Sequence, residues 1–170
     1  MDKTVCSAIC SLGLFPKTHL QSSFTCAEEE IEITFKVTRS CQFFTEMCRQ
    51  SESHKELIED HIFISQSKNS VSFLTRFPHN GLYLITLYAK PKDYEGILSC
   101  VYQYVTEVTK AMDVLKPFPK CSNMWGEGCT VKGMDEGYLP CDTEIPIAAT
   151  VPDAKRVVVT GSEWQYLQKV

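Results

Sequence analysis

Residues 70–90 read S-V-S-F-L-T-R-F-P-H-N-G-L-Y-L-I-T-L-Y-A-K, two apolar runs separated by Pro78-His79-Asn80-Gly81. Side chains of a strand alternate between its two faces. The residues that share one face are therefore Val71, Phe73, Thr75 and Phe77 in the first run, and Leu82, Leu84, Thr86 and Tyr88 in the second. The Asn80-Gly81 pair supplies the positive φ angles of a tight reversal. The stretch therefore predicts a β-hairpin within a scaffold of strands.

Further segments on both sides of this stretch have the pattern of short strands. Glu30–Val37 alternates between polar and apolar residues, which is typical of a half-buried antiparallel strand. Cys41–Cys48 and His61–Gln66 are shorter candidates, and Ile97–Thr109 is crowded with β-branched and aromatic residues. The polar, acidic segment 50–60 predicts a loop or a single helical turn. About six or seven short strands without a long helix indicate an all-β fold, an antiparallel β-sandwich.

The character of the chain changes near residue 115. Residues 116–120 read K-P-F-P-K, which cannot continue a strand ladder because proline lacks the N–H donor. The segment Cys121–Cys141 that follows is rich in Gly, Asn, Asp and Pro. We predict a sandwich over residues 1–115. Residues 116–170 then form a Pro/Gly-rich link and a partial second β module, or else complete the first sandwich.

Charge and hydropathy exclude two classes of partner. The chain has a formal net charge of -4 and a pI near 5.6, with no cluster of Lys or Arg. It therefore lacks the basic footprint of a protein that binds the phosphate backbone of nucleic acid. No segment approaches the ~20 apolar residues that a membrane helix needs. We predict neither nucleic-acid binding nor membrane association.

The nine cysteines are an odd number, which cannot all pair within one chain. Several lie in apolar, strand-like runs, as Cys41, Cys48 and Cys100 do, where a free cysteine behaves as a small buried hydrophobe. This pattern favours a reducing, cytoplasmic location. The first residues resemble a secretory signal only faintly, because Ser, Thr and Cys interrupt the apolar part. A small secreted, disulfide-bonded β domain is the alternative.

Four of these segments together resemble one known family. Phe73–Lys90 has that family's order of a strand, a P-x-x-G turn and a strand ending in Y-A-K, and the resemblance continues through Cys100–Val105, Pro117–Pro119 and Trp125–Gly128. The chain resembles the C-terminal Ig-like region of the kyphoscoliosis peptidase and hillarin family, large cytoskeleton-associated proteins with a transglutaminase-like core. The resemblance implies an Ig-like sandwich and a scaffold role in the cytoplasm, with cytoskeletal protein partners.

The resemblance does not extend to the chemistry of that family. There, papain-like catalysis uses a Cys, a His and an Asp of an upstream core. This chain has neither a G-x-C-x-G-type nucleophile turn nor a His-Ala-Trp-type histidine, so no catalytic residue is carried over. The first interpretation is a non-catalytic protein-interaction or scaffold module, not an enzyme. The alternative is an accessory part or divergent fragment of a cysteine-dependent transglutaminase-like peptidase.

Residue types alone would allow a catalytic centre of Cys100 with His61 or His79 and Asp93. A cysteine nucleophile needs a nearby base and a lowered pKa, and no local signature of such a centre accompanies these residues. We therefore predict no catalytic residue. We expect Cys100 to be a core residue on a strand, and His79 to be an exposed turn residue.

The cysteine spacing does not predict a metal site. Cys6 and Cys10 are spaced like half of a zinc site, but structural zinc needs a second close pair downstream. The later residues Cys121, Cys129 and Cys141 offer thiolates without that pair. We predict no bound metal.

Two other features invite a ligand but lack its signature. Trp125–Gly128 (W-G-E-G) is not followed by the G-K-[ST] of a phosphate loop, so we expect a packed loop in which Trp125 covers an end of the sandwich. The acidic runs Glu28–Glu30 and Glu56–Asp60 lack the alternating oxygen ligands of a calcium loop, and we expect solvated charges. No cofactor is predicted. A binding module of this kind would use a sheet edge or an exposed apolar face, which leave almost no trace in the sequence.

Overall fold

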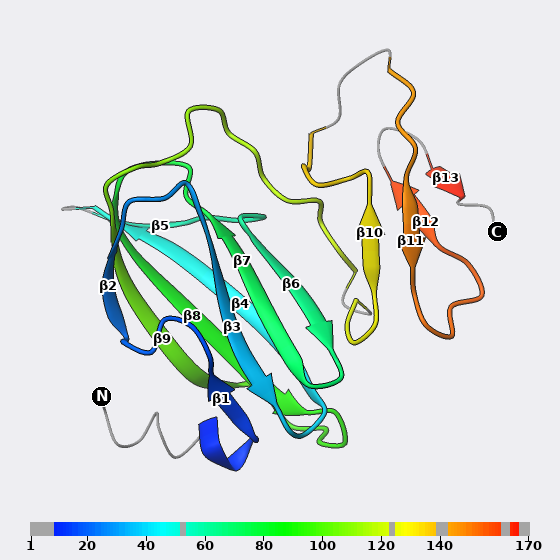
Figure 1. Ribbon diagram of the computed structural model, residues 1–170, viewed down its shortest axis with the longest axis horizontal. Helices are drawn as coiled ribbons and strands as arrows, with labels where there is room; N and C mark the ends of the chain where they lie inside the picture. The colour runs from blue at the N-terminus through cyan, green and yellow to red at the C-terminus, as the bar shows by residue number, and fades with distance from the viewer. Residues whose placement is uncertain (1–8, 52–53, 123–124, 139–142, 161–163, 167–170) are drawn as a thin grey trace.

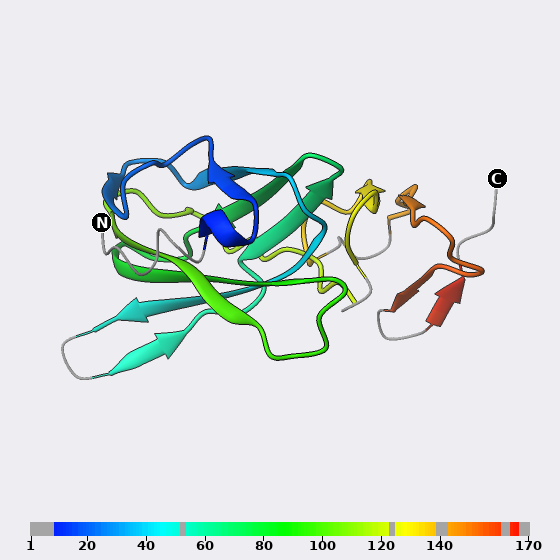
Figure 2. The same cartoon turned by 90° about the horizontal axis from the view of Figure 1, so that it is seen from below.

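Two β-sheets packed face to face form the body of the protein in the computed structural model, which describes residues 9–51, 54–122, 125–138, 143–160 and 164–166. One sheet has the strand order β1-β3-β7-β6 and the other has the order β2-β9-β8-β4-β5 (Figures 1 and 2). Neighbouring strands pair antiparallel in both sheets, except that β2 runs parallel to β9. The predicted all-β, antiparallel sandwich is confirmed.

The strand bounds agree closely with the sequence pattern. The first sheet consists of β1 (Leu14–Pro16), β3 (Glu30–Val37), β7 (Ser70–Arg76) and β6 (Ile62–Ser67). The second consists of β2 (Ser23–Cys26), β9 (Ser99–Val108), β8 (Gly81–Pro91), β4 (Cys41–Gln50) and β5 (Lys55–Leu57). The four strands predicted outside the opening stretch correspond to β3, β4, β6 and β9.

Strand β5 was not expected, and the prediction of a loop or helical turn over residues 50–60 is wrong for this part. Residues Lys55–Leu57 pair antiparallel with the end of β4, and all three side chains are exposed. A three-residue strand with no buried face has no alternation to detect. It is a strand only because β4 offers it backbone partners.

The core lies between the sheets and is built from the inward side chains of both. The largest fully buried side chains include Phe35 and Phe73 from the first sheet and Tyr83, Tyr102 and Tyr104 from the second. Several of these rings meet at steep angles, as Phe35 and Phe73 do, whose centroids lie 6.1 Å apart at 85°. The residues predicted to share one face, Val71, Phe73, Thr75 and Phe77, are all fully buried, so this is the inward face of β7.

The two halves of the opening stretch do not form a hairpin, so that prediction is wrong. Strand β7 pairs with β3 and β6, whereas β8 pairs with β4 and β9 in the opposite sheet. The segment from Phe77 to Asn80 is a corner that carries the chain across the sandwich. Within the Asn80-Gly81 pair only Gly81 has a positive φ, +135, so the two-residue turn is not made.

Strand β8 is apolar on both faces, and its predicted face is the outer one. Leu82, Leu84, Thr86 and Tyr88 do share a face, but the core is filled by the alternate residues Tyr83, Ile85, Leu87 and Ala89. A strand with two apolar faces carries no alternation that identifies the inner one. This leaves apolar side chains on the outside of the five-stranded sheet.

Beyond β9 the chain forms two small antiparallel pairs beside the sandwich (Figure 1). Strand β10 (Thr130–Lys132) pairs with β11 (Ala148–Thr150), and β12 (Val158–Thr160) pairs with β13 (Trp164–Tyr166). Neither pair joins a sheet of the sandwich. The boundary near residue 115 stays a prediction.

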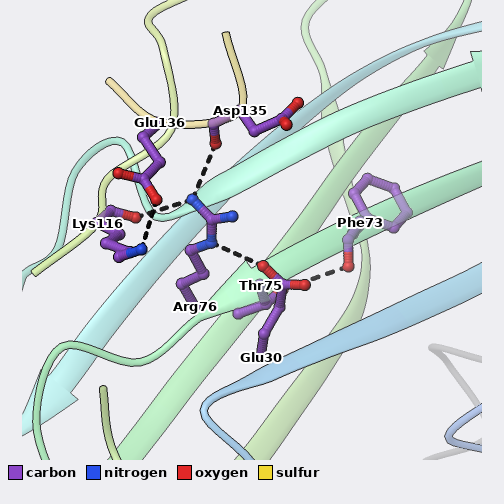
Figure 3. A network of polar contacts seen from close by, with 7 residues as sticks. All are labelled: Glu30, Phe73, Thr75, Arg76, Lys116, Asp135 and Glu136. Atoms are coloured by element: carbon purple, nitrogen blue, oxygen red, sulfur yellow. Dashed lines mark hydrogen bonds and ion pairs between the residues drawn. The ribbon is translucent and has the colours of Figure 1, made fainter. Parts of the chain in front are cut away.

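Arg76 ties the first part of this C-terminal segment to the sandwich (Figure 3). Its Nε pairs with the Glu30 carboxylate at 2.7 Å, and its Nη1 donates to the backbone oxygens of Lys116 and Asp135, both at 3.0 Å. Its guanidinium carbon also lies 4.0 Å from the centre of the Phe118 ring. One side chain thus holds residues from three separate segments together.

In the described part of the chain, no helix is long and apolar enough to cross a membrane.

Candidate interaction surface

The outer face of the five-stranded sheet carries a row of apolar side chains that crosses four strands. The register places Leu57 of β5 opposite Cys48 of β4, Cys48 opposite Leu84 of β8, and Leu84 opposite Val105 of β9. Leu57 is 54% exposed and Val105 is 36% exposed. Because directly opposed residues of neighbouring strands lie on the same side of a sheet, the row is continuous.

A second apolar group lies on the same face, four residues further along β8. Phe44 of β4 is opposite Tyr88, and their ring centroids are 5.9 Å apart. Cys100 of β9 is opposite Tyr88 on its other side. Phe44 is 53% exposed, so a large part of an aromatic residue faces solvent here. We call this group and the row above, together with Leu82, the outer apolar face.

A polar row separates the two apolar groups. Glu46, Thr86 and Gln103 lie opposite one another on β4, β8 and β9, and the Gln103 side-chain amide donates to the Thr86 hydroxyl at 3.3 Å. Burial raises the pKa of the Tyr88 hydroxyl, and the nearby Glu46 carboxylate raises it further. Apart from Glu46 and the exposed Glu107, which lies opposite Leu82, this part of the face presents neutral side chains, which suits protein contact more than anion binding.

The outer face of the other sheet is more polar and is partly covered. Thr34 and Ser72 hydrogen-bond to each other across β3 and β7 at 3.3 Å. Phe63 of β6 is covered by Phe118 and Trp125, with ring centroids 5.8 and 6.0 Å away. Residues of the C-terminal segment thus cover apolar surface of this sheet, whereas the outer apolar face has no such cover from the described residues.

The residues considered for catalysis are dispersed. Cys100 pairs with Tyr88 near one end of β8, and His79 lies beyond the other end, roughly 20 Å away at the rise of a strand. His61 lies beside the other sheet, with its Nδ1 2.6 Å from the Glu59 carbonyl oxygen. Asp93 pairs with Arg39. Burial raises the pKa of the Cys100 thiol, which disfavours the thiolate that a nucleophile needs.

The predicted positions of Cys100 and His79 differ in one respect. His79 is exposed in the corner between the sheets, as expected of a turn residue. Cys100 is exposed on the outer face and is not a core residue, so that expectation is wrong. A register shift where Leu87 and Tyr88 face β9 inserts Val101 as an extra residue, which turns Cys100 outward.

Among the described residues, the cysteines considered for zinc do not come together in one site. Within these ranges no group of three Cys, His, Asp or Glu side chains has the geometry to hold a metal ion. Cys10 is exposed near the start of the described chain, and Cys121 and Cys129 lie in the C-terminal segment. Cys6 and Cys141 lie outside the described residues. The seven described cysteines are free thiols.

The W-G-E-G loop and the acidic runs serve structural contacts. Trp125 packs on Phe63 rather than over an end of the sandwich, and Glu127 lies 3.9 Å from the Lys92 ammonium. In the acidic runs, several carboxylates form ion pairs and are not simply solvated as expected. These pairs are Glu29 with Lys110, Glu30 with Arg76, Glu56 with Arg49, and Asp60 with Lys120.

Sequence reasoning missed the outer apolar face because its members come from four strands. A usable signal was present in β8, where both alternating sets of residues are apolar although only one can face the core. An apolar outward set on a central strand indicates either a covering layer or a binding surface.

Of three comparisons with known proteins, one identifies a family. A family model described as the KY-like, immunoglobulin-like domain matches residues 5–119. A comparison with curated proteins finds no match. One solved structure, described as "Structural basis of T cell specificity and activation by the bacterial superantigen toxic shock syndrome toxin-1", contains a chain that is 11% identical. The alignment covers 56% of this protein and 97% of that chain, with a TM-score of 0.34. A TM-score of that size does not establish a shared fold.

The strand order agrees with the family match. In Ig-like sandwiches, strands A, B, E and D form one sheet, and strands C, F and G form the other, which can gain C′ at its edge. When the strands are lettered along the chain, β1, β3, β7 and β6 correspond to A, B, E and D, and β5, β4, β8 and β9 correspond to C′, C, F and G. Such a domain suggests a protein-interaction module. The chain belongs to the KY-like, immunoglobulin-like domain family.

Proposed function

We propose that the protein is a non-catalytic interaction module that binds a partner protein through the outer apolar face. The observation that carries this proposal is the row Leu57, Cys48, Leu84 and Val105, which crosses four strands and ends in exposed side chains. Contiguous apolar surface rimmed by polar residues is typical of protein contact sites. The exposed Phe44 ring beside Tyr88 supplies the aromatic anchor that dominates many interfaces.

The proposed partner is a cytoskeletal protein, and the proposed location is the cytoplasm. The family resemblance motivates the partner, since the related full-length proteins are associated with the cytoskeleton and carry a transglutaminase-like core. The seven free thiols support a reducing compartment, in which disulfides rarely form. In this proposal the domain anchors a larger assembly and leaves any chemistry to other domains.

A capture experiment tests the surface with two matched phenylalanines. Phe44 is 53% exposed on the outer apolar face, and Phe15 is 44% exposed on the opposite sheet. We expect the wild type and Phe15→Glu to retain a filament-associated protein from cell lysate, and Phe44→Glu to lose most of it. Purified components should then reproduce the contact. Equal retention by both variants would contradict the assignment of this surface.

The proposed lack of enzymatic activity is tested in a separate assay. The purified chain is incubated with a glutamine-containing acyl donor and an amine, and with a denatured protein substrate. We expect neither amine incorporation nor cleavage above the blank. Turnover that disappears after thiol alkylation would favour the alternative, a part of a cysteine-dependent transglutaminase-like peptidase.

A further inference from the structure

Strand β4 has an open edge over the first half of its length. On one side β4 pairs with β8 along all of its residues, from Cys41 opposite Pro91 to Gln50 opposite Leu82. On the other side it pairs with β5 only from Cys48 to Gln50, and the Met47 carbonyl oxygen accepts one more bond from the Ile58 N–H at 2.9 Å. Among the described residues, no strand lies beside the backbone from Gln42 to Glu46 on that side.

The hydrogen-bond pattern shows which groups of this edge are unpaired. In an antiparallel ladder, alternate residues direct both their N–H and C=O to the same neighbour. Met47 directs its carbonyl away from β8, and so does Cys41, whose oxygen accepts a bond from the Gln66 side-chain amide at 3.0 Å. Phe43 and Thr45 lie two and four residues after Cys41, so their backbone groups have the same orientation as those of Cys41 and Met47. Their N–H and C=O groups therefore point out of the open edge, and no bond to them is present among the described residues.

The two ends of this gap are closed by the protein itself. The Gln66 side chain is buried and caps the Cys41 end, while Ile58 occupies the Met47 end. The gap thus offers four backbone groups, the N–H donors and C=O acceptors of Phe43 and Thr45, which are two residues apart. An extended strand carries its own donors and acceptors at that repeat, and a helix or a side-chain ligand does not.

Apolar side chains line the side of the sandwich that the gap borders. Phe43 points inward, with its ring centroid 5.9 Å from that of Phe73, and is only partly buried. Ile58, and Ile62 and Ile64 of β6, pack against the same core and are partly buried as well. Over the open part of β4, this strand is the border of its sheet, and β6 is the border of the other sheet on the same side. A strand added to β4 would cover this surface with every second side chain.

A second copy of the chain does not suit the gap. Strand β4 spans ten residues, and its counterpart in another copy would have to run past Met47, where Ile58 is already bonded. The open part covers only Gln42–Glu46 and fits a short peptide segment. The Glu46 carboxylate at its border would favour a basic residue opposite, because oppositely charged cross-strand pairs are stabilising.

We propose that the open edge of β4 at Phe43 and Thr45 binds a short extended segment of a partner protein, which adds as a strand beside β4. The segment has small or apolar residues at the alternate positions that face the core, and a Lys or Arg opposite Glu46. This edge adjoins the outer apolar face at Phe44 but binds through the backbone groups of Phe43 and Thr45, and the inference rests on the proposed interaction function only in that both require a protein partner. Main-chain bonds supply the affinity, and the apolar positions supply the selectivity.

The test uses the full chain and a phage-displayed random peptide library as the probe. Peptides selected on the wild type are then measured against Thr45→Pro and Thr45→Val. Proline removes one edge N–H and, at an open edge, leaves the ladder with β8 intact. Valine keeps the N–H at nearly the same side-chain size. We expect Thr45→Pro to weaken binding about tenfold or more, and Thr45→Val to bind like the wild type.

A second measurement on the wild type does not depend on the variant. We expect the amide protons of Phe43 and Thr45 to exchange rapidly in the free chain and to become protected when a selected peptide binds. The amides of Gln42 and Phe44, already bonded to β8, should be protected in both states. Failure to select any peptide, equal binding by both variants, or unchanged exchange at Phe43 and Thr45 would each overturn the proposal. So would a dimer of the free chain that Thr45→Pro dissociates, since the occupant would then be a second copy. None of these results depends on capture of a cytoskeletal partner by the outer apolar face.

Discussion

The Tyr83 hydroxyl donates a hydrogen bond to the backbone oxygen of His79 at 2.7 Å and accepts one from the backbone N–H of the same residue at 3.2 Å. His79 lies in the corner that carries the chain from β7 in one sheet to β8 in the other. Tyr83 is fully buried, and its ring centroid is 5.2 Å from that of Phe77. This is the tyrosine corner of Ig-like sandwiches, in which one side chain fixes the path of the backbone between the sheets.

We expect Tyr83→Phe to lower the free energy of unfolding by about 1–3 kcal/mol, because two backbone groups of His79 lose their buried partner while the ring keeps its packing. Urea unfolding followed by fluorescence measures the change. The matched control is Tyr88→Phe on the outer face, where the described residues provide no such bond to the hydroxyl. Equal effects of the two substitutions would show that the corner bond adds nothing to stability.

Tyr104→Phe should have the opposite sign. The Tyr104 hydroxyl is buried without a hydrogen-bond partner among the described residues, so burial of this group costs free energy that phenylalanine avoids. We expect an unchanged or higher unfolding free energy, by up to about 1 kcal/mol, in the same urea assay. Destabilisation similar to that of Tyr83→Phe would mean that the hydroxyl has a partner, such as an internal water.

Arg76→Ala should loosen the C-terminal segment. The substitution removes the ion pair with Glu30, the bonds to the Lys116 and Asp135 carbonyl oxygens, and the contact with the Phe118 ring. Hydrogen bonds of a charged donor contribute about 1.5–3 kcal/mol each at partly buried sites. We expect faster amide exchange across residues 116–137 in mass spectrometry.

Arg39→Ala is the control for that experiment. Arg39 pairs with Asp93 at 3.1 Å, but both side chains are at least half exposed, and such pairs contribute about 0–1 kcal/mol. It should leave exchange at residues 116–137 unchanged. A comparable increase in both variants would argue against a specific role of Arg76.

Stability should fall at alkaline pH. Burial raises the pKa values of the Cys26, Cys41 and Cys48 thiols and of the Tyr83 hydroxyl. Cys121 is exposed as a residue, but desolvation of its thiol and the neighbouring Cys129 thiol raise its pKa to about 11. A group whose pKa is higher in the folded state stabilises the fold fully below its unfolded pKa, and this contribution is lost as the pH rises through the folded value. For Cys121 the loss falls between pH 9 and about 11.

Thermal unfolding measured from pH 7 to 11 checks this direction, and iodoacetamide labelling at each pH reports the thiolates. We expect the unfolding temperature to decline above pH 9, and labelling of Cys121 to keep rising up to about pH 11. Maximal labelling of Cys121 already at pH 8 would show that its thiol is not shielded in the folded protein.

Several features could be predicted from the residues alone, because their signal is local. The alternation of Glu30–Val37 identifies β3 and its buried face without knowledge of any partner. The odd residues of β7 are assigned to the core for the same reason. The charge balance and the lack of a long apolar run likewise depend on composition. The family resemblance gave the Ig-like class, which the match over residues 5–119 supports.

Other features depend on which strands meet. The corner at His79 cannot be told from a hairpin turn by its residues, since the distinction lies in the pairing of β7 with β3 and of β8 with β4. The exposed strand β5 exists only beside β4, and the position of Cys100 follows from a register shift between β8 and β9. Both candidate binding surfaces are of this kind.

The amino-acid sequence by itself determined that this protein is an all-β chain with an apolar core, because the period of two along a strand is written in adjacent residues. The tertiary structure decided which apolar face of β8 points outward and which half of β4 has an unpaired edge. Those properties arise from contacts between residues far apart in the chain, as between Leu84 and Cys48 or Gln66 and Cys41. Backbone pairing across strands leaves no local signature, so the surfaces proposed for binding emerge only when the sheets are assembled.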